Sequence, residues 1–129
     1  MNSIEILIEK LNKEQKDAVL STEGPNLIVA GAGSGKTRVL TTRLMHIIDM
    51  KKAFPNQILC VTFTNKAARE MQNRVMQHIK GSTNAIPWLG TFHSISVKIL
   101  RRHAEALGYK GNFTILDTDD QKKTFEKYS

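Results

Sequence analysis

The sequence predicts an α/β fold in which helices flank a parallel sheet. Residues 27–30 (LIVA) form an apolar run without polar alternation, which is typical of a strand covered on both faces. Residues 58–63 (ILCVTF) are rich in β-forming residues and predict a second strand. A helical pattern follows each run. Because strands and helices alternate, the strands are expected to lie parallel, with right-handed connections.

The segment before the first strand predicts helices. Apolar residues recur at helical spacing near the start of the chain, so a short amphipathic helix is expected to end near Leu11. Asn12 is suited to cap a second helix, whose inner face carries Gln15, Ala18 and Val19. Residues 21–25 (STEGP) then predict a turn.

Each predicted strand leads into an amphipathic helix. The helix after Lys36 is expected to bury one apolar face, made of Leu40, Leu44, Ile47 and Ile48. Thr64 or Asn65 can cap the helix after the second strand, and its expected inner face consists of Ala68, Met71, Val75 and Ile79.

The last third of the chain gives weaker signals. Residues 86–91 are a candidate third strand, although Pro87 and Gly90 are unfavourable there. Residues 92–107 predict a helix that Gly108 ends as a C-cap. Residues 113–116 (FTIL) suggest a short extended piece, and residues 117–121 (DTDDQ) resemble a helix start.

Composition and charge favour a globular domain with an acidic partner. The chain has 129 residues, 40% of them apolar and 24% charged, which is enough for one packed core. Nineteen Lys and Arg against twelve Asp and Glu give a formal charge of +7. This excess favours nucleic acid or nucleotide as a partner, although many basic domains simply present a solvated surface.

Cysteine and hydropathy patterns exclude several classes of site. Cys60 is the only cysteine, so the chain forms neither an internal disulfide nor a zinc cluster, and its place in an apolar run predicts a buried structural thiol. No apolar run is long enough to span a membrane, and the first residues lack a signal-peptide layout. A reducing cytoplasmic location without membrane contact is expected.

The stretch LIVAGAGSGKT has the spacing of a phosphate-binding loop. In such a loop, backbone N–H groups surround phosphates at the positive end of a helix. Lys36 would reach the β- and γ-phosphates and Thr37 would ligate Mg²⁺, which makes these two residues the catalytic candidates. The alternative is a glycine-rich turn without a ligand, but the flanking strand and helix favour a nucleoside triphosphate. The expected cradle is Ala30, in place of the usual first glycine, followed by Gly31, Ala32, Gly33, Ser34, Gly35, Lys36 and Thr37.

Further stretches carry a resemblance to a known family. They are LNKEQ at 11–15, VTFTNKAAREM at 61–71, GTFHS at 90–94 and FTILD at 113–117. With the glycine loop, their order and distances resemble the amino-terminal part of a superfamily 1 DNA helicase of the UvrD/Rep/PcrA type. The resemblance implies a RecA-like P-loop NTPase sheet with flanking helices, truncated before the motor core is complete. It places the first part of the motor domain at 1–110 and the start of an inserted helical subdomain at 111–129.

The resemblance also implies roles in nucleotide binding. In these helicases the glutamine at the position of Gln15 recognises adenine, so the expected nucleotide is ATP with Mg²⁺. A side-chain amide suits the adjacent donor and acceptor of adenine. Arg38 resembles the arginine that lies against the adenine face, where its planar guanidinium can stack. Lys13 stands where the family often has proline, a difference at the start of the helix rather than at the amide.

Two motifs resemble the family's contacts with single-stranded DNA. Thr64, Asn65 and Lys66 offer donors to phosphates, and Phe63 offers a stacking face, although Phe63 taken alone would be assigned to the core. In the second motif the expected contacts are Thr91, His93 and Ser94. The family's partners are single-stranded and partly duplex DNA, the second motor domain of the same chain, and repair or replication proteins.

Parts of a complete motor are missing from these residues. Hydrolysis needs an acidic motif that holds Mg²⁺ and an arginine that offsets transition-state charge. Asp117 superficially resembles the acid, but the family comparison assigns it to a cap or surface position, because the acidic pair lies farther along. The expected function is the ATP- and DNA-binding lobe of a DNA helicase, with this fragment inactive alone. The alternatives are the motor part of a helicase-nuclease and a stand-alone P-loop nucleotide-binding module or kinase.

Overall fold

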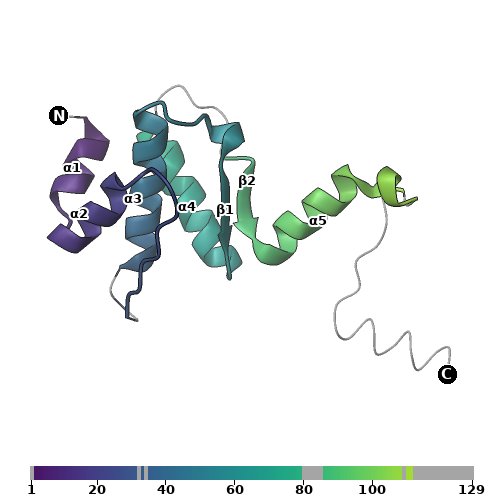
Figure 1. Ribbon diagram of the computed structural model, residues 1–129, viewed down its shortest axis with the longest axis horizontal. Coiled ribbons are helices and arrows are strands. Elements are labelled where there is room, and N and C mark those ends of the chain that lie inside the picture. Colours follow the sequence, from purple (N-terminus) through teal and green to yellow (C-terminus); the bar gives the residue numbers. More distant parts are fainter. Residues whose placement is uncertain (1, 32, 34, 80–85, 109, 112–129) are drawn as a thin grey trace. The chain divides into compact units, whose positions relative to one another are not determined.

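The computed structural model describes residues 2–31, 33, 35–79, 86–108 and 110–111 (Figure 1). The chain divides into two compact units, Met1–Thr91 and Phe92–Ser129. The first unit contains the helices α1 to α4 and the strands β1 and β2, and the second begins with α5.

The first two helices begin with the same capping arrangement. Ahead of α1 (Ser3–Glu9), the Asn2 side chain accepts a hydrogen bond from the N–H of Glu5 at 2.8 Å. Ahead of α2 (Lys13–Leu20), the Asn12 side chain accepts one from the N–H of Gln15 at 2.9 Å. In both boxes the third helical residue returns a bond to the cap's own N–H. The predicted cap at Asn12 is confirmed.

Helix α3 (Lys36–Asp49) packs against α1, α2 and α4 (Figure 1). Its buried face differs from the prediction in part, since Leu40 is 40% exposed. The hydroxyls of Thr41 and Thr42 donate to the carbonyls of Thr37 and Arg38 at 2.6 and 2.7 Å. Because these hydroxyls have hydrogen-bond acceptors within the helix, both threonines can be buried in the core. The buried face of α3 therefore includes them and not Leu40. The buried residues are Val39, Thr41, Thr42, Leu44 and Met45.

The sheet consists of β1 (Leu59–Thr62) and β2 (Trp88–Thr91), which pair in parallel as predicted. The register places Leu59 beside Trp88 and Thr62 beside Thr91. The short 3-10 helix η1 (Pro55–Gln57) precedes β1. Helix α4 (Asn65–His78) begins at Thr64, whose hydroxyl caps the N–H of Ala67 at 3.1 Å.

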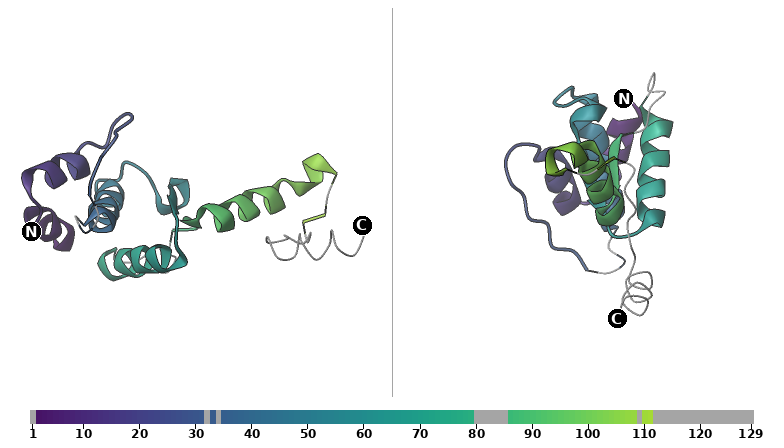
Figure 2. Two further views of the ribbon diagram at one scale, coloured as in Figure 1. Left: turned by 90° about the horizontal axis from the view of Figure 1, so that it is seen from below. Right: turned by 90° about the vertical axis from the view of Figure 1, so that its right-hand side faces the viewer.

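Helix α4 packs against both strands and against α3, as the views in Figure 2 also show. Its inner face confirms the prediction, because Ala68, Met71 and Val75 are buried. Cys60 on β1 lies in the same core, and burial raises the pKa of its thiol. The thiol is therefore a structural apolar group, as expected.

The predicted strand at residues 27–30 is wrong for this structure. These residues adopt no regular secondary structure, and Leu27 and Val29 are 91% and 89% exposed. A strand requires neighbours that satisfy its backbone N–H and C=O groups. In the part of the chain that the structure describes, β1 and β2 pair with each other and with no other strand. The apolar run therefore lacks the neighbours that would cover it.

The described part of the second unit contains a helix and a short 3-10 helix. Helix α5 (Phe92–Arg102) ends earlier than predicted, and the 3-10 helix η2 (Ala104–Leu107) continues to Gly108. Gly108 has φ +80°, which confirms it as a left-handed cap. The predicted segments 113–116 and 117–121, with Asp117, lie outside the described residues. Among the described helices, none has the length and apolar character of a membrane span.

Gln72 fixes the start of β2. From α4, its Nε2 donates to the carbonyl of Ile86 at 2.7 Å, and its Oε1 accepts from the N–H of Ile86 at 3.0 Å. Ile86 is 1% exposed, so its N–H depends on this amide rather than on water, whereas its carbonyl also accepts a longer bond of 3.4 Å from the N–H of Leu89. A side chain on α4 thus holds the strand that pairs with β1.

We predict that Gln72→Ala lowers the free energy of unfolding by about 1–3 kcal/mol, because the buried N–H of Ile86 loses its acceptor and the Ile86 carbonyl keeps only the longer bond from Leu89. Urea unfolding followed by circular dichroism measures the change. Gln77→Ala, at an exposed position of the same helix, is the matched control and should be nearly neutral. Equal stability of the two variants would contradict the role of Gln72.

Candidate nucleotide and DNA site

The glycine loop ends at the amino terminus of α3. Gly33 and Gly35 have φ of +75° and +81°, a left-handed conformation that L side chains rarely adopt. Gly35 is the N-cap of α3, and no side chain caps the helix there. Lys36 and Thr37 follow in the first turn, are exposed, and are accompanied by no acidic residue. The positive end of a long helix therefore lies open beside a lysine, which suits an anion.

Gln15 lies next to this loop. Its Nε2 is 3.9 Å from the point where a Cβ on Gly35 would stand. Its Oε1 accepts a hydrogen bond from the N–H of Asn12 at 3.1 Å, as part of the capping box of α2. The capping box thus sets the direction of the amide, with its N–H₂ end on the side of the glycine loop. Residues 20 positions apart in the sequence are brought together by the packing of α2 against α3.

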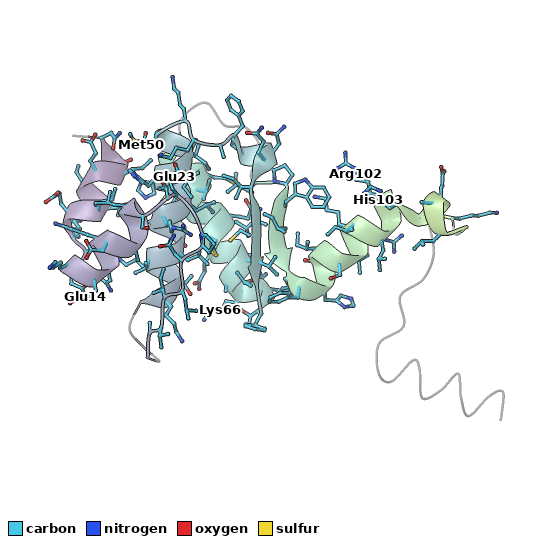
Figure 3. The ribbon with its side chains drawn as sticks, viewed as in Figure 1. Glu14, Glu23, Met50, Lys66, Arg102 and His103 are labelled. Carbon is cyan, nitrogen blue, oxygen red and sulfur yellow. The ribbon has the colours of Figure 1, made fainter. Side chains whose placement is uncertain are left out.

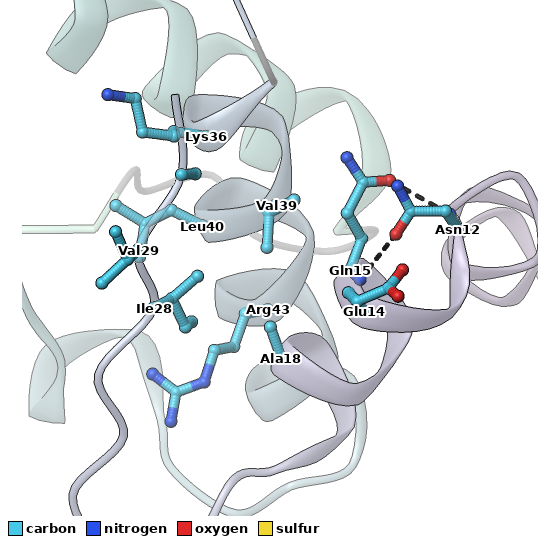
Figure 4. A pocket seen from close by; sticks show the side chains of 11 residues that line it. Asn12, Glu14, Gln15, Ala18, Ile28, Val29, Lys36, Val39, Leu40 and Arg43 are labelled. Atoms are coloured by element: carbon cyan, nitrogen blue, oxygen red, sulfur yellow. Dashed lines mark hydrogen bonds between the residues drawn. The ribbon is translucent and has the colours of Figure 1, made fainter. Parts of the chain in front are cut away.

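A pocket of about 520 Å³ lies between α2, α3 and residues 28–30 (Figure 4). It is mostly apolar, with Lys36 and Arg43 as its cations and Glu14 as its acid. A pocket of this size, apolar with a few polar groups, suits the base and sugar of a nucleotide. Its lining residues are Asn12, Glu14, Gln15, Ala18, Ile28, Val29, Ala30, Lys36, Val39, Leu40 and Arg43.

The structure describes only some of the other residues predicted to bind the nucleotide. Gly31 is described and exposed, whereas Ala32 and Ser34 lie outside the described residues. Arg38 is exposed on α3 and is not among the residues that line the pocket. Arg43 lines it instead, which the sequence analysis missed. The available signal was its spacing, because positions i and i+7 lie on one face of a helix and Arg43 stands seven residues after Lys36.

The predicted DNA motif after β1 lies at the carboxyl end of the sheet. Phe63 is 89% exposed directly after β1, and Thr64, Asn65 and Lys66 are exposed at the start of α4. Figure 3 shows Lys66 at the start of α4, near the carboxyl end of β1. The hydroxyl of Thr62 donates to the Thr64 carbonyl at 3.0 Å, which orders the turn between strand and helix.

The second DNA motif begins at the same edge. Thr91 ends β2 and pairs with Thr62 in the parallel register, so the ends of both strands meet. Ligands of parallel sheets bind outside the carboxyl ends of the strands. His93 and Ser94 are exposed in the first turn of α5, which belongs to the second unit. The structure thus joins Thr91 to the first motif, and it places His93 and Ser94 next along the chain.

No group of three or more His, Cys, Asp or Glu side chains that could hold a metal occurs among the described residues. At the nucleotide site, the Thr37 hydroxyl is exposed beside Lys36 and is the group available to a hard cation. Such a cation would draw its other ligands from phosphate and water, as Mg²⁺ commonly does.

Comparison with known proteins identifies the family of the chain. Residues 11–129 match the model of the UvrD/REP helicase N-terminal domain. The chain belongs to the UvrD/REP helicase family. Proteins named ATP-dependent DNA helicase PcrA, from Staphylococcus epidermidis and Staphylococcus aureus, are each 52% identical to it over 120 residues. The matched part is 93% of this chain and 16% of each relative.

Family membership confirms the resemblance that the motifs predicted. The match begins at Leu11, one residue before the capping box, and it includes the glycine loop and both DNA motifs. Because the chain spans 16% of the length of these relatives, the family shows what kind of protein contains the chain, and the roles of individual residues depend on the geometry above.

We predict that Gln15→Ala lowers the free energy of unfolding by about 0.5–1.5 kcal/mol, because the Asn12 N–H loses its acceptor. Gln15→Glu should leave stability nearly unchanged, since glutamate serves equally well at this position of a capping box. Urea unfolding of both variants tests the difference. If both variants were destabilised alike, the capping role of the Gln15 amide oxygen would be refuted.

Proposed function

We propose that the chain is the ATP- and DNA-binding lobe of an ATP-dependent DNA helicase, with a RecA-like P-loop arrangement. The observation that carries the proposal is that the Gln15 side chain lies beside Gly35, at the end of the glycine loop. Gln15 and Lys36 line the same pocket. One site thereby offers a base-reading amide and a phosphate-binding helix terminus.

The phosphates would bind at the start of α3. Backbone N–H groups of the first turn have no partners within the helix and point toward the loop. Lys36 adds a flexible positive charge for the β- and γ-phosphates. Thr37 would contribute one ligand to Mg²⁺, which when bound neutralises phosphate charge. These residues bind and orient the nucleotide, and the proposed acidic motif and arginine come from outside residues 1–129.

The base would bind toward α2. An amide can donate to N7 and accept from N6–H of adenine, and a carbonyl oxygen can accept a second hydrogen bond beside the one from Asn12. Ala18, Ile28 and Val39 supply apolar surface in the same pocket. The stacking role of Arg38 stays a prediction, because that side chain lies outside the pocket lining.

Single-stranded DNA would bind across the carboxyl ends of β1 and β2. The exposed ring of Phe63 offers a stacking surface for a base, which is sequence-tolerant. Thr64, Asn65, Lys66 and Thr91 provide donors for phosphates, and His93 and Ser94 extend the set in the next turn of chain.

In the complete protein, we propose that residues 1–110 form the first part of the motor domain and residues 111–129 begin an inserted helical subdomain. Closure of a second motor domain on ATP, and its reopening after hydrolysis, would move the protein along one DNA strand. The motor part of a helicase-nuclease would share this lobe. A stand-alone nucleotide-binding module or kinase would share the pocket and lack DNA binding.

The nucleotide site is tested by binding of ATP with Mg²⁺, measured by titration calorimetry. We expect Lys36→Ala to weaken binding about 10- to 100-fold, because a charge-assisted contact to phosphate is lost. Lys10→Ala removes the same charge at an exposed site after α1 and should bind as the unmodified chain does. Equal affinity of both variants would show that the glycine loop is a turn without a nucleotide. DNA-stimulated ATP hydrolysis by this chain alone would refute the proposal that hydrolysis needs an acidic motif and an arginine from outside residues 1–129.

The DNA site is tested with a fluorescent single-stranded oligonucleotide at several salt concentrations. We expect Phe63→Ala to weaken binding about 5- to 100-fold through loss of base stacking. Phe54→Ala is the matched control, because Phe54 is also exposed, at 67%, but lies before the amino end of β1. Binding should fall steeply with salt. ATP binding without any DNA binding would support the nucleotide-binding module or kinase instead.

A further inference from the structure

Arg43 joins the end of α2 to the middle of α3. Its Nη2 donates a hydrogen bond of 3.0 Å to the carbonyl of Ser21, which is the C-cap residue of α2. The last carbonyls of a helix have no partner within the helix, so a cation there satisfies one and also complements the helix dipole. The contact joins residues 22 positions apart and crosses between the two helices that flank the nucleotide pocket.

The guanidinium is held in this position although one of its donors is unsatisfied. The Nε of Arg43 is buried and has no hydrogen-bond partner among the described residues. A buried donor without a partner is unfavourable and calls for an explanation. The side chain lines the pocket, so its position is defined by the space between α2 and α3 rather than by solvent.

The turn that Arg43 holds leads directly to the phosphate loop. Asn26 closes this turn, since its Nδ2 donates to the carbonyls of Ser21 and Gly24 at 3.3 and 3.0 Å and its Oδ1 accepts from the Ser21 hydroxyl at 2.8 Å. The turn is therefore internally connected. A contact to the Ser21 carbonyl fixes both α2, which carries Gln15, and residues 27–30, which lead into the glycines.

The geometry of α3 places Arg43 at one end of the pocket and Lys36 at the other. Seven residues along a helix correspond to roughly 10 Å on one face. In Figure 4 the two side chains lie at opposite ends of the view, with Gln15 to one side. The distance between the base-reading amide and the phosphate-binding turn is thus set by how α2 is attached to α3, and Arg43 provides a polar attachment inside the pocket.

We propose that Arg43 is a positioning residue for base recognition: through the Ser21 carbonyl it holds α2 so that Gln15 meets adenine while the phosphates occupy the start of α3. The inference rests on the proposed nucleotide site. It assigns to Arg43 the part of the affinity that depends on the base, and none of the part that depends on the phosphates.

Two ligands separate these parts. ATP with Mg²⁺ uses the base and the phosphates, whereas inorganic tripolyphosphate with Mg²⁺ uses the phosphate cradle alone. Arg43→Lys keeps the charge but loses the planar fork, and it should weaken ATP binding about 3- to 10-fold. Its affinity for tripolyphosphate should equal that of the unmodified chain. The preference for ATP over GTP should shrink by the same factor as the ATP affinity.

Lys52→Met is the matched control. The Nζ of Lys52 lies 2.7 Å from Glu23 Oε1 and holds the same turn from outside the pocket. This ion pair is largely exposed and contributes little, so the control should bind both ligands as the unmodified chain does. A loss in Lys52→Met equal to that in Arg43→Lys would overturn the specific role of Arg43.

A double-mutant cycle tests whether Arg43 acts through Gln15. Gln15→Glu keeps the capping box and removes the donor for N7 of adenine. If Arg43 acts by placing Gln15, adding Arg43→Lys to Gln15→Glu should cause no further loss of ATP affinity. Additive losses would instead show direct contact between Arg43 and the nucleotide and would overturn the positioning role.

The remaining outcomes are also decisive. Arg43→Lys could lose ATP and tripolyphosphate affinity equally and have a lowered melting temperature. This result would show that Arg43 only stabilises the fold, and it would overturn the inference. Unchanged affinity for both ligands would overturn it as well. An unmodified chain that binds neither ligand would refute the proposed nucleotide site itself, and this result differs from every outcome in which only Arg43 fails.

Discussion

The packing of α3 into the core is the constraint on which the rest of the structure depends. This helix contacts α1, α2 and α4, and it begins at the phosphate loop. Its first turn is consequently both a part of the fold and exposed to solvent at Lys36 and Thr37. Met45 and Leu44 are almost completely buried, so the direction of the helix axis is fixed by apolar contacts that close packing makes rigid. The exposed amino terminus of α3 therefore has a fixed position.

Polar side chains in and around this core restrict its arrangement more than apolar packing does. Thr41 and Thr42 bond to their own helix, while Gln72 bonds to the backbone of Ile86 and thereby selects the position of β2. Arg43 and the capping box at Asn12 act in the same way around the nucleotide pocket. Hydrogen bonds are directional, so each of these contacts specifies one arrangement among the many that apolar burial alone would tolerate.

The pocket between α2 and α3 and the carboxyl edge of the sheet border the same core. Helix α3 packs against α4, and α4 begins at Thr64, directly after the exposed Phe63. The start of α3 and the start of α4 are therefore held in one packed core.

The sequence by itself determined most of the local elements and the family to which the chain belongs. Capping residues such as Asn12 and Thr64 and the glycines of the loop act on their near neighbours, so their effects are readable from local spacing. Helix patterns with strong apolar periodicity, as at Met71 and Val75, were equally readable. The motif order likewise led to the helicase family.

Only the tertiary structure decided which residues meet. The exposure of residues 27–30 depends on whether other strands pair with them, which a local apolar run does not encode. The face that α3 buries depends on its contacts with α1, α2 and α4, and the place of Arg43 depends on its hydrogen bond to Ser21, the C-cap of α2. These are long-range packing effects, and they override local pattern because burial and hydrogen bonding are satisfied by whichever neighbours the fold supplies.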